Sequence, residues 1–365
     1  MITITKDYNY TCPYDLNRLM DPERLLFFDI ETTGLSAKRD LVYLIGCVYF
    51  RDGGWHLRQW FSDSAEAEKE VLLHFFLFAS RFSMLIHFNG TTFDLPFLKE
   101  RASKHRLTLP SREPESFDLY RKLRPMKQLL GLSDCKQKTL ETFLGTGRED
   151  PYNGGELIRF YWDYLQTGEK RLYDALLLHN AEDIMGLPEL FTLFHYKDFF
   201  SGPFSLCSEQ VQEYLTLSGS TEQELFLTFE HPSITLPVPF TYGADELRIS
   251  CRKNRLILRL PLEHMTLRYF FPDYKNYYYL PEEDQAIHKS VAVFVDSAHK
   301  KKATAKTCYQ NRTGVFFPVP DLSGSLPPLF YREYKKKPAY LEYTPGIGEN
   351  TTLFQSILLA KLPFS

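Results

Sequence analysis

Residues 25–35 of the chain are LLFFDIETTGL, an apolar run that ends in two acids and a Thr-Thr-Gly turn. Consecutive apolar residues bounded by a turn signal are typical of a buried central strand. Asp29 and Glu31 lie two residues apart in this run, so both carboxylates project from the same face. Neighbouring carboxylates repel each other and are costly to bury unless a cation neutralises them. The alternative is a strand end at which both acids meet solvent.

The segments that follow alternate between strand and helix patterns. Runs rich in β-branched and aromatic residues and bounded by turn signals predict three more strands, over 41–50, 55–61 and 83–89. Helix formers with apolar residues at helical spacing predict helices over 64–80, 93–105 and most of 139–194. This order favours an α/β domain in which antiparallel strands precede a parallel part.

The chain has 365 residues, which is too many for one typical hydrophobic core. Beyond residue 240, turn signals and alternating strand patterns replace the helical ones. We therefore expect four parts: an irregular lead-in over 1–22, an α/β domain over 23–200, a linker region over 201–240, and a β-rich domain over 241–365.

Composition excludes several protein classes. The chain is 44% hydrophobic and 24% charged, which is typical of a soluble globular protein. The six cysteines are scattered singly, so zinc-site and thioredoxin-like motifs are absent, and reduced thiols in a cytoplasmic protein are expected. The N-terminus lacks a signal-peptide pattern, and no stretch approaches the roughly 20 apolar residues that span a bilayer. We expect no membrane association.

Two further acids lie on predicted helices. Asp94 is at the start of one helix, where the helix dipole alone would favour an acid. His179 and Asp183 are four residues apart on another and share a face with Leu176 and Leu187, so the pair points inward. A structural ion pair would also account for Asp183. Taken singly, each acid has an ordinary explanation.

Taken together, the acids resemble a known family. FFDIETTGL (27–35), HFNGTTFDLPFL (87–98) and HNAEDIMGL (179–187) resemble the three motifs of the DEDD 3′→5′ exonucleases, in the same order. The stretch KTLETFLGTGREDPYNGGELIRFYWDYLQTGE (138–169) is similar to the YprB-like branch of the ribonuclease H-like nucleases. The resemblance covers about residues 23–200. It implies a ribonuclease H-like fold, with a mixed sheet flanked by helices, followed here by the β-rich domain.

The resemblance also implies a chemistry. Asp29, Glu31, Asp94 and Asp183 would bind two divalent ions, about 3.5–4 Å apart, that stabilise the attacking and leaving oxygens of a phosphodiester. Oxygen ligands suit Mg²⁺ or Mn²⁺. By the family pattern, Asp29 would bridge both ions, Glu31 and Asp183 would serve one, and Asp94 the other. Substrate contacts are expected from the motif residues Thr32, Thr33, Gly34, Leu35, Asn89 and Phe93, with Leu35 wedged under the terminal base.

The general base departs from the family pattern. His179 precedes Asp183 by four residues, which is the spacing of the subclass that uses Tyr, whereas His in this group is usually five residues before the Asp. A neutral imidazole near pH 7 is a competent base, so His179 is assigned this role. A histidine that only packs beside the metals is the alternative. Asp118 is a fifth acid without a motif around it and is interpreted as structural.

The second domain is basic and aromatic. Between Arg248 and Tyr340 there are 17 Lys and Arg against 8 Asp and Glu. Bases stack on aromatic rings while cations follow the phosphate backbone, so this domain is a candidate platform for single-stranded nucleic acid. The alternative is a β-domain with an aromatic core and a solvated basic face.

The sequence thus predicts a metal-dependent 3′→5′ exonuclease that acts on 3′ ends of single-stranded DNA or RNA. Two other classes stay open. One is a catalytically idle nucleic-acid-binding or scaffold protein, which the retention of four mutually repelling carboxylates disfavours. The other is a structure-specific endonuclease on the same fold.

Overall fold

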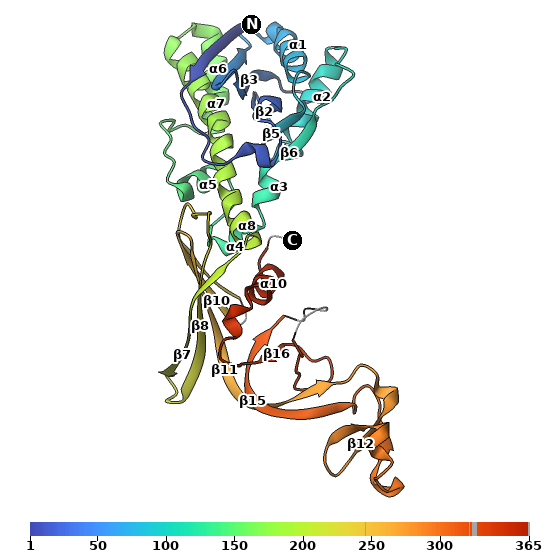
Figure 1. Cartoon of the computed structure of the whole chain (residues 1–365). Coiled ribbons are helices and arrows are strands. Elements are labelled where there is room, and N and C mark those ends of the chain that lie inside the picture. Colours follow the sequence, from blue (N-terminus) through green and yellow to red (C-terminus); the bar gives the residue numbers. More distant parts are fainter. Residues whose placement is uncertain (245, 321, 323–326, 364–365) are drawn as a thin grey trace. The chain divides into compact units, whose positions relative to one another are not determined.

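The computed structural model describes residues 1–244, 246–320, 322 and 327–363, and the chain divides into two compact units, Met1–His195 and Tyr196–Ser365 (Figure 1). In the first unit the strands are β1 (Ile2–Tyr8), β2 (Leu25–Thr32), β3 (Val42–Arg51), β4 (Gly54–Phe61), β5 (Met84–His87) and β6 (Glu115–Asp118). Its helices are α1 (Glu68–Ala79), α2 (Asp94–Lys104), α3 (Leu119–Leu123), α4 (Met126–Leu129), α5 (Gln137–Leu144), α6 (Gly154–Thr167) and α7 (Lys170–Leu190). The helix α8 (Phe194–Ser201) follows.

The first unit is built on a six-stranded mixed sheet in the order β1-β4-β3-β2-β5-β6. Strands β1 to β4 pair antiparallel, whereas β5 and β6 extend the sheet from β2 in parallel. One face packs against α1 and α2 through a cluster that includes Leu26, Phe28 and Phe75. The other face packs against α6 and α7 through a second cluster around Tyr43 and Tyr161. The expected mixed sheet flanked by helices is confirmed.

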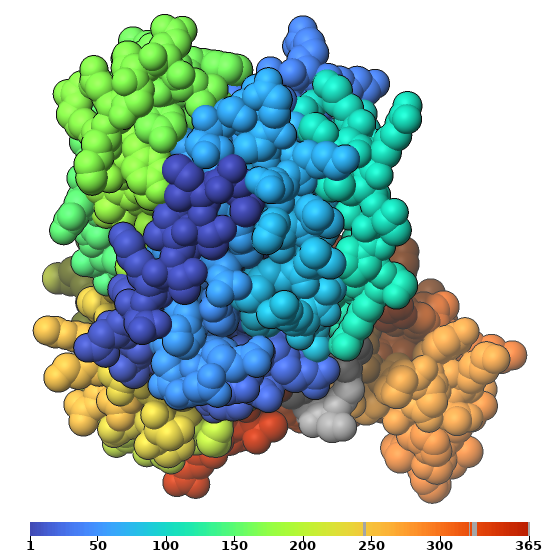
Figure 2. Space-filling view, turned by 90° about the horizontal axis from the view of Figure 1, so that it is seen from above, coloured from blue at the N-terminus to red at the C-terminus, as the bar shows by residue number. Residues whose placement is uncertain are grey.

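The lead-in expected over 1–22 is not irregular throughout, because β1 pairs with β4 from Trp55 to Phe61. Ile2 and Ile4 pack against the cluster around Tyr43, while Thr3 and Thr5 are exposed. This two-residue alternation is the signal of a half-buried strand. Figure 2 shows this dark-blue strand at the surface, between the green of α6 and the light blue of α1.

The second unit is β-rich, as expected. Its strands are β7 (Ser205–Leu215), β8 (Thr221–Glu230), β9 (Phe240–Ala244), β10 (Leu247–Arg252), β11 (Arg255–Phe270), β12 (Tyr277–Leu280), β13 (Gln285–His288), β14 (Lys301–Lys302), β15 (Tyr309–Val319) and β16 (Ala339–Glu342). Two helices, α9 (Lys289–Ala292) and α10 (Thr351–Lys361), accompany them. The long strand β11 pairs with β8 and β10 in its first half and with β15 in its second, and β12, β13 and β14 form a separate three-stranded sheet.

The segment expected to be a linker, 201–240, instead forms β7 and β8, so β-structure begins before residue 241. Leu225, Leu227 and Phe229 of β8 are buried at alternate positions in the unit's core. Strand β7 lies at the edge of the sheet and is exposed along most of its length, which explains its polar sequence. Among the described residues, no helix is both long enough and apolar enough to cross a membrane.

Candidate active site

Strand β2 lies in the middle of the sheet and presents Asp29 and Glu31 to the face covered by α7. Its alternate residues Phe28 and Ile30 are buried against the α1 side, so the two acids must face the other way. The Glu31 side chain is 14% exposed. The position of the acids is therefore a consequence of the period of the strand and of which face the apolar residues bury.

Helix α7 brings His179 and Asp183 over these acids. His179 Nε2 lies 3.2 Å from Asp183 Oδ2 and 3.8 Å from Glu31 Oε1. One ligand atom from each of these three residues lies within 4.8 Å of the other two. The two α7 residues, four positions apart on the helix, thus form one cluster with Glu31 of the central strand.

Asp94 joins the cluster from the first turn of α2. It is 5% exposed, and its charge acts directly on Asp29 and Glu31. The turn before it is held by Asp118, whose carboxylate accepts the Asn89 N–H at 2.9 Å and the Thr91 N–H at 3.3 Å. Asp118 also caps α3. These contacts agree with its interpretation as a structural residue.

Ionising all the carboxyl groups of this cluster at once is energetically unfavourable. Burial, followed by the charges of Asp94, Asp183 and Glu31, raises the pKa of Asp29 well above its usual range. Burial and the charge of Asp183 do the same to the pKa of Glu31. Burial raises the pKa of Asp94 to about 7. Such a site gains most from bound cations, and its oxygen-rich donor set fits hard divalent ions such as Mg²⁺ or Mn²⁺.

One cation of the chain already contacts the cluster. Arg148 donates from Nη1 to Asp183 Oδ1, and from Nε and Nη2 to the buried Glu141 at 2.5 and 2.8 Å. These charges raise the pKa of the Arg148 guanidinium despite its burial. A Cβ on Gly186 would lie 2.2 Å from Glu141 Oε1, so glycine is what lets α5 and α7 approach here. Arg148 therefore fixes the orientation of the Asp183 carboxylate.

A second set of contacts fixes Asp29. Asn180 Nδ2 donates to Asp29 Oδ2 at 3.4 Å, and Gln59 Nε2 of β4 donates to Asn180 Oδ1 at 2.9 Å. Gly46 of β3 is the register partner of Asp29, and a Cβ there would lie 1.9 Å from Asn180 Oδ1. A side chain at position 46 would therefore expel the amide that orients Asp29.

His179 has a partner on its far side. Its Nδ1 lies 2.5 Å from Asp150 Oδ2, in the loop between α5 and α6. Glu182 of α7 holds this loop by accepting the backbone N–H groups of Glu149 and Asp150 at 2.7 and 3.0 Å. Sequence analysis assigned no role to Asp150, Arg148, Asn180 or Gln59. The acidic pattern of the loop in the family-like stretch was the available signal for the first two.

The loop after β2 is arranged by its own polar groups. Thr32 Oγ1 donates to Gly34 O at 2.8 Å, and Thr33 Oγ1 accepts the Leu41 N–H at 2.9 Å. Gly34 packs on Asp40 so closely that a Cβ would lie 2.5 Å from its carboxylate oxygen. Leu35 is 88% exposed, which is unusual for a leucine in a loop with so many fixed contacts. Of these residues, Leu35 alone keeps its whole side chain available.

Asn89 and Phe93 lie in the turn before Asp94. The exposed Asn89 has a left-handed φ of 63° and accepts a hydrogen bond from Thr92 Oγ1 at 2.9 Å. Phe93 is half-buried, with its ring centroid 5.4 Å from that of Phe97. Both residues thus shape the turn, and their contact with a substrate stays a prediction.

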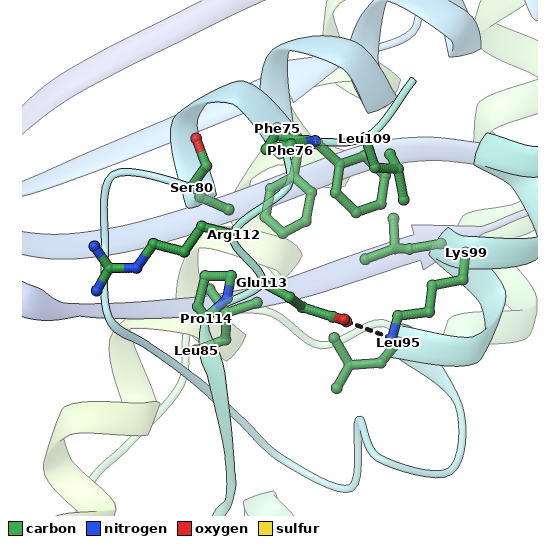
Figure 3. A pocket seen from close by; sticks show the side chains of 13 residues that line it. Phe75, Phe76, Ser80, Leu85, Leu95, Lys99, Leu109, Arg112, Glu113 and Pro114 are labelled. Carbon is green, nitrogen blue, oxygen red and sulfur yellow. Dashed lines mark ion pairs between the residues drawn. The ribbon is translucent and has the colours of Figure 1, made fainter. Parts of the chain in front are cut away.

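A separate pocket in the same unit contains none of the predicted site residues. Phe75 and Phe76 of α1 and Leu95 of α2 line its apolar part, and an ion pair between Lys99 and Glu113 lies at its rim (Figure 3). Its volume is about 110 Å³. Small-molecule sites usually enclose roughly 300–1,000 Å³, so this pocket is too small for an ordinary cofactor.

A comparison with protein-family models agrees with the fold. Residues 26–195 match the model of the RNase_H superfamily, and this segment has a ribonuclease H-like fold. No curated protein matches the chain. The family B DNA polymerase from the hyperthermophilic archaeon Pyrobaculum calidifontis aligns over 49% of this chain and 25% of its own, with 17% identity and a TM-score of 0.39.

A second solved structure is the zinc-bound complex of E. coli ExoI with single-stranded DNA. It aligns over 57% of this chain and 54% of its own, with 13% identity and a TM-score of 0.29. Both alignments span less than two thirds of the length of the solved proteins. The similarity to the YprB-like branch stays a prediction.

Proposed function

We propose that this protein is a metal-dependent 3′→5′ exonuclease of single-stranded DNA or RNA. The observation that carries the proposal is the convergence of four carboxylates from three separate elements on one cluster. Asp29 and Glu31 come from β2, Asp94 from α2 and Asp183 from α7. The ribonuclease H-like domain supports a nuclease reaction in general. Structural ion pairing alone does not account for Asp29 and Glu31, whose pKa values are raised by burial and by the charges of the neighbouring acids.

The four acids would hold two Mg²⁺ or Mn²⁺ ions. When bound, such ions stabilise negative charge on the attacking and leaving oxygens of the phosphodiester. His179 Nε2 faces the same cluster, and in our proposal it accepts the proton of the attacking water. Asn180 and Arg148 keep the carboxylates of Asp29 and Asp183 oriented.

The assignment of an exonuclease rests on the loop after β2. Leu35 lies in this loop, four residues after Glu31, and its exposed side chain is available to pack under the last base of a strand. Thr32, Thr33 and Gly34 fix the loop that carries it, while Asn89 and Phe93 form the neighbouring turn. A wedge against a terminal base favours removal of single nucleotides from an end.

A digestion assay tests the proposal. The protein would be incubated with 5′-labelled single-stranded DNA or RNA and Mn²⁺. We expect a ladder that shortens from the 3′ end, that disappears with EDTA, and that Asp29→Ala reduces by a factor on the order of 10³ or more because charge stabilisation is lost. The control is Asp174→Ala, an exposed acid of α7 paired with Lys170. Digestion that survives EDTA or Asp29→Ala would refute the proposal.

The other function classes give different results in the same assay. Internal cuts in a hairpin or circular substrate, without 3′ shortening, would indicate a structure-specific endonuclease. Binding of the labelled strand without any cleavage would indicate a catalytically idle nucleic-acid-binding protein. Comparing the DNA and RNA substrates in parallel identifies the polymer.

A further inference from the structure

The loop between α5 and α6 contacts one face of α7 at three successive points. Arg148 meets Asp183, the backbone of Glu149 and Asp150 meets Glu182, and the Asp150 side chain meets His179. The three α7 residues lie within two turns on one side of the helix. The loop is therefore docked on the same residues that form the candidate active site.

Asp150 is enclosed and directed at one ring nitrogen. Its side chain is 1% exposed, Oδ1 accepts the Tyr152 N–H at 3.0 Å, and Oδ2 faces His179 Nδ1. The ammonium of Lys138 is more distant, with Nζ 3.8 Å from Oδ2. A carboxylate can only accept a hydrogen bond, so the hydrogen between these two groups belongs to Nδ1 of the imidazole.

We propose that Asp150 is a positioning residue that fixes the tautomer and orientation of His179, an inference that rests on the proposed nuclease function. With hydrogen on Nδ1, the lone pair of a neutral ring is at Nε2. Nε2 is the atom beside Glu31 and Asp183. Asp150 thus directs the acceptor of the neutral ring toward Glu31 and Asp183. When cations neutralise these two carboxylates, Nε2 would be available to an attacking water.

The hydrogen bond from Tyr152 gives Asp150→Asn a distinct effect. In this variant the amide oxygen keeps the bond from the Tyr152 N–H, so the amide NH₂ faces Nδ1. Because NH₂ donates, it stabilises the ring with its hydrogen on Nε2, which is the wrong tautomer for the site. Asp150→Ala removes the partner but imposes neither tautomer. A purely structural acid would not produce this difference.

The two variants therefore distinguish a role of Asp150 in positioning His179 from a role in stabilising the fold. We expect kcat to fall about 100-fold or more in Asp150→Asn, to fall less in Asp150→Ala, and KM to change little in both. The melting temperature should follow the opposite order, with Asp150→Asn nearer the wild type because it keeps the Tyr152 hydrogen bond and its side-chain volume. Asp174→Asn, an exposed acid of the same helix, serves as control and should leave kcat and the melting temperature unchanged.

A spectroscopic measurement tests the tautomer without relying on activity. Long-range ¹H–¹⁵N correlation spectra of the full chain, recorded with Mg²⁺ well above the ordinary imidazole pKa of about 6.5, report which ring nitrogen carries hydrogen. The His179 signal is assigned by its loss in His179→Gln. We expect hydrogen on Nδ1 in the wild type and on Nε2 in Asp150→Asn. Hydrogen on Nε2 in the wild type, an unchanged tautomer in Asp150→Asn, or a kcat of Asp150→Asn within about threefold of wild type overturns the proposal.

Failure of the proposed function gives a different pattern. If the wild type digests no substrate while its spectra show the expected tautomers, the exonuclease proposal fails and the role of Asp150 in orienting His179 stands. If the wild type digests substrate but the tautomer does not respond to Asp150→Asn, the reverse holds.

Discussion

Asp94 illustrates how a single residue can lower stability in order to serve a site. Burial raises its pKa from the ordinary 3.8 to about 7 in the folded chain. Between these two values the folded state binds more protons than the unfolded state, so the free energy of unfolding falls as pH rises through this window. Above pH 7 the folded state bears the full free-energy cost of burying the ionised Asp94 carboxylate. A carboxamide at this position has the same shape but does not ionise.

We therefore expect Asp94→Asn to be more stable than wild type at pH 8 in EDTA, by on the order of 1 kcal/mol or more. At pH 4 the two proteins should melt at nearly the same temperature. The same variant should lose digestion and the stabilisation that Mn²⁺ confers on the wild type. Thermal melts at both pH values, with Asp174→Asn as control, measure this. A stability difference between Asp94→Asn and wild type in EDTA that does not grow from pH 4 to 8 would contradict the raised pKa of Asp94.

Single residues of the candidate site differ in how far the sequence reveals them. Asp29, Glu31 and Asp183 are visible because strand and helix periods place them on defined faces. Asn180 and Gln59 are 121 positions apart in the chain, and their contact depends on how α7 packs across β4. No local pattern encodes such a pair, which is why the sequence predicted the acids but not the residues that orient them.

At the level of elements, the contact between β3 and α7 depends on a glycine. Gly46 has no conformational need for glycine, since its φ is not in the left-handed region, but its missing Cβ makes room for Asn180. We expect Gly46→Ala to destabilise the first unit by about 1–3 kcal/mol, because the helix or the amide must move. Digestion should fall as well, since Asn180 would no longer reach Asp29.

Chemical denaturation of the full chain and the digestion assay measure both effects. The matched control is Gly154→Ala, at the first position of α6, where a Cβ would meet nothing within 4 Å. Alanine is the better helix former, so this control should be neutral or slightly stabilised. Equal stability of the Gly46→Ala and Gly154→Ala variants would show that Asn180 and α7 adjust without cost.

The sequence predicted the elements whose apolar pattern is strong. Strands β2, β3 and β4 and helix α1 agree with the expected segments within a few residues. The prediction missed β1 because its aliphatic residues are only two, Ile2 and Ile4. It missed β6 because this strand has four residues, of which only one is buried. It mistook the β7–β8 hairpin for a linker because the edge strand is polar on both faces. Short or solvent-facing strands owe their pairing to neighbours that local sequence does not specify.

At the scale of the whole molecule, the candidate site and the basic segment lie in different units. Every residue of the candidate site lies within Met1–His195, whereas the excess of lysine and arginine lies in residues 248–340 of the second unit. In the three-stranded sheet of that unit, Lys301 and Lys302 are exposed on β14, and Lys302 pairs in register with Tyr278. Adjacent cations and an aromatic ring are the combination that binds phosphates and stacks bases in single strands. We propose that this sheet contributes to substrate binding.

The double variant Lys301→Ala/Lys302→Ala tests this contribution in the full chain. We expect KM for a long single strand to rise several-fold while kcat stays unchanged, because the variant removes only contacts to phosphates outside the site. The dependence of log K on log salt should become shallower by roughly 0.7 for each lost phosphate contact. Lys69→Ala, an exposed lysine of α1, is the control for a simple loss of positive charge. An unchanged salt slope would mean that Lys301 and Lys302 are only solvated and that this sheet does not contribute to substrate binding.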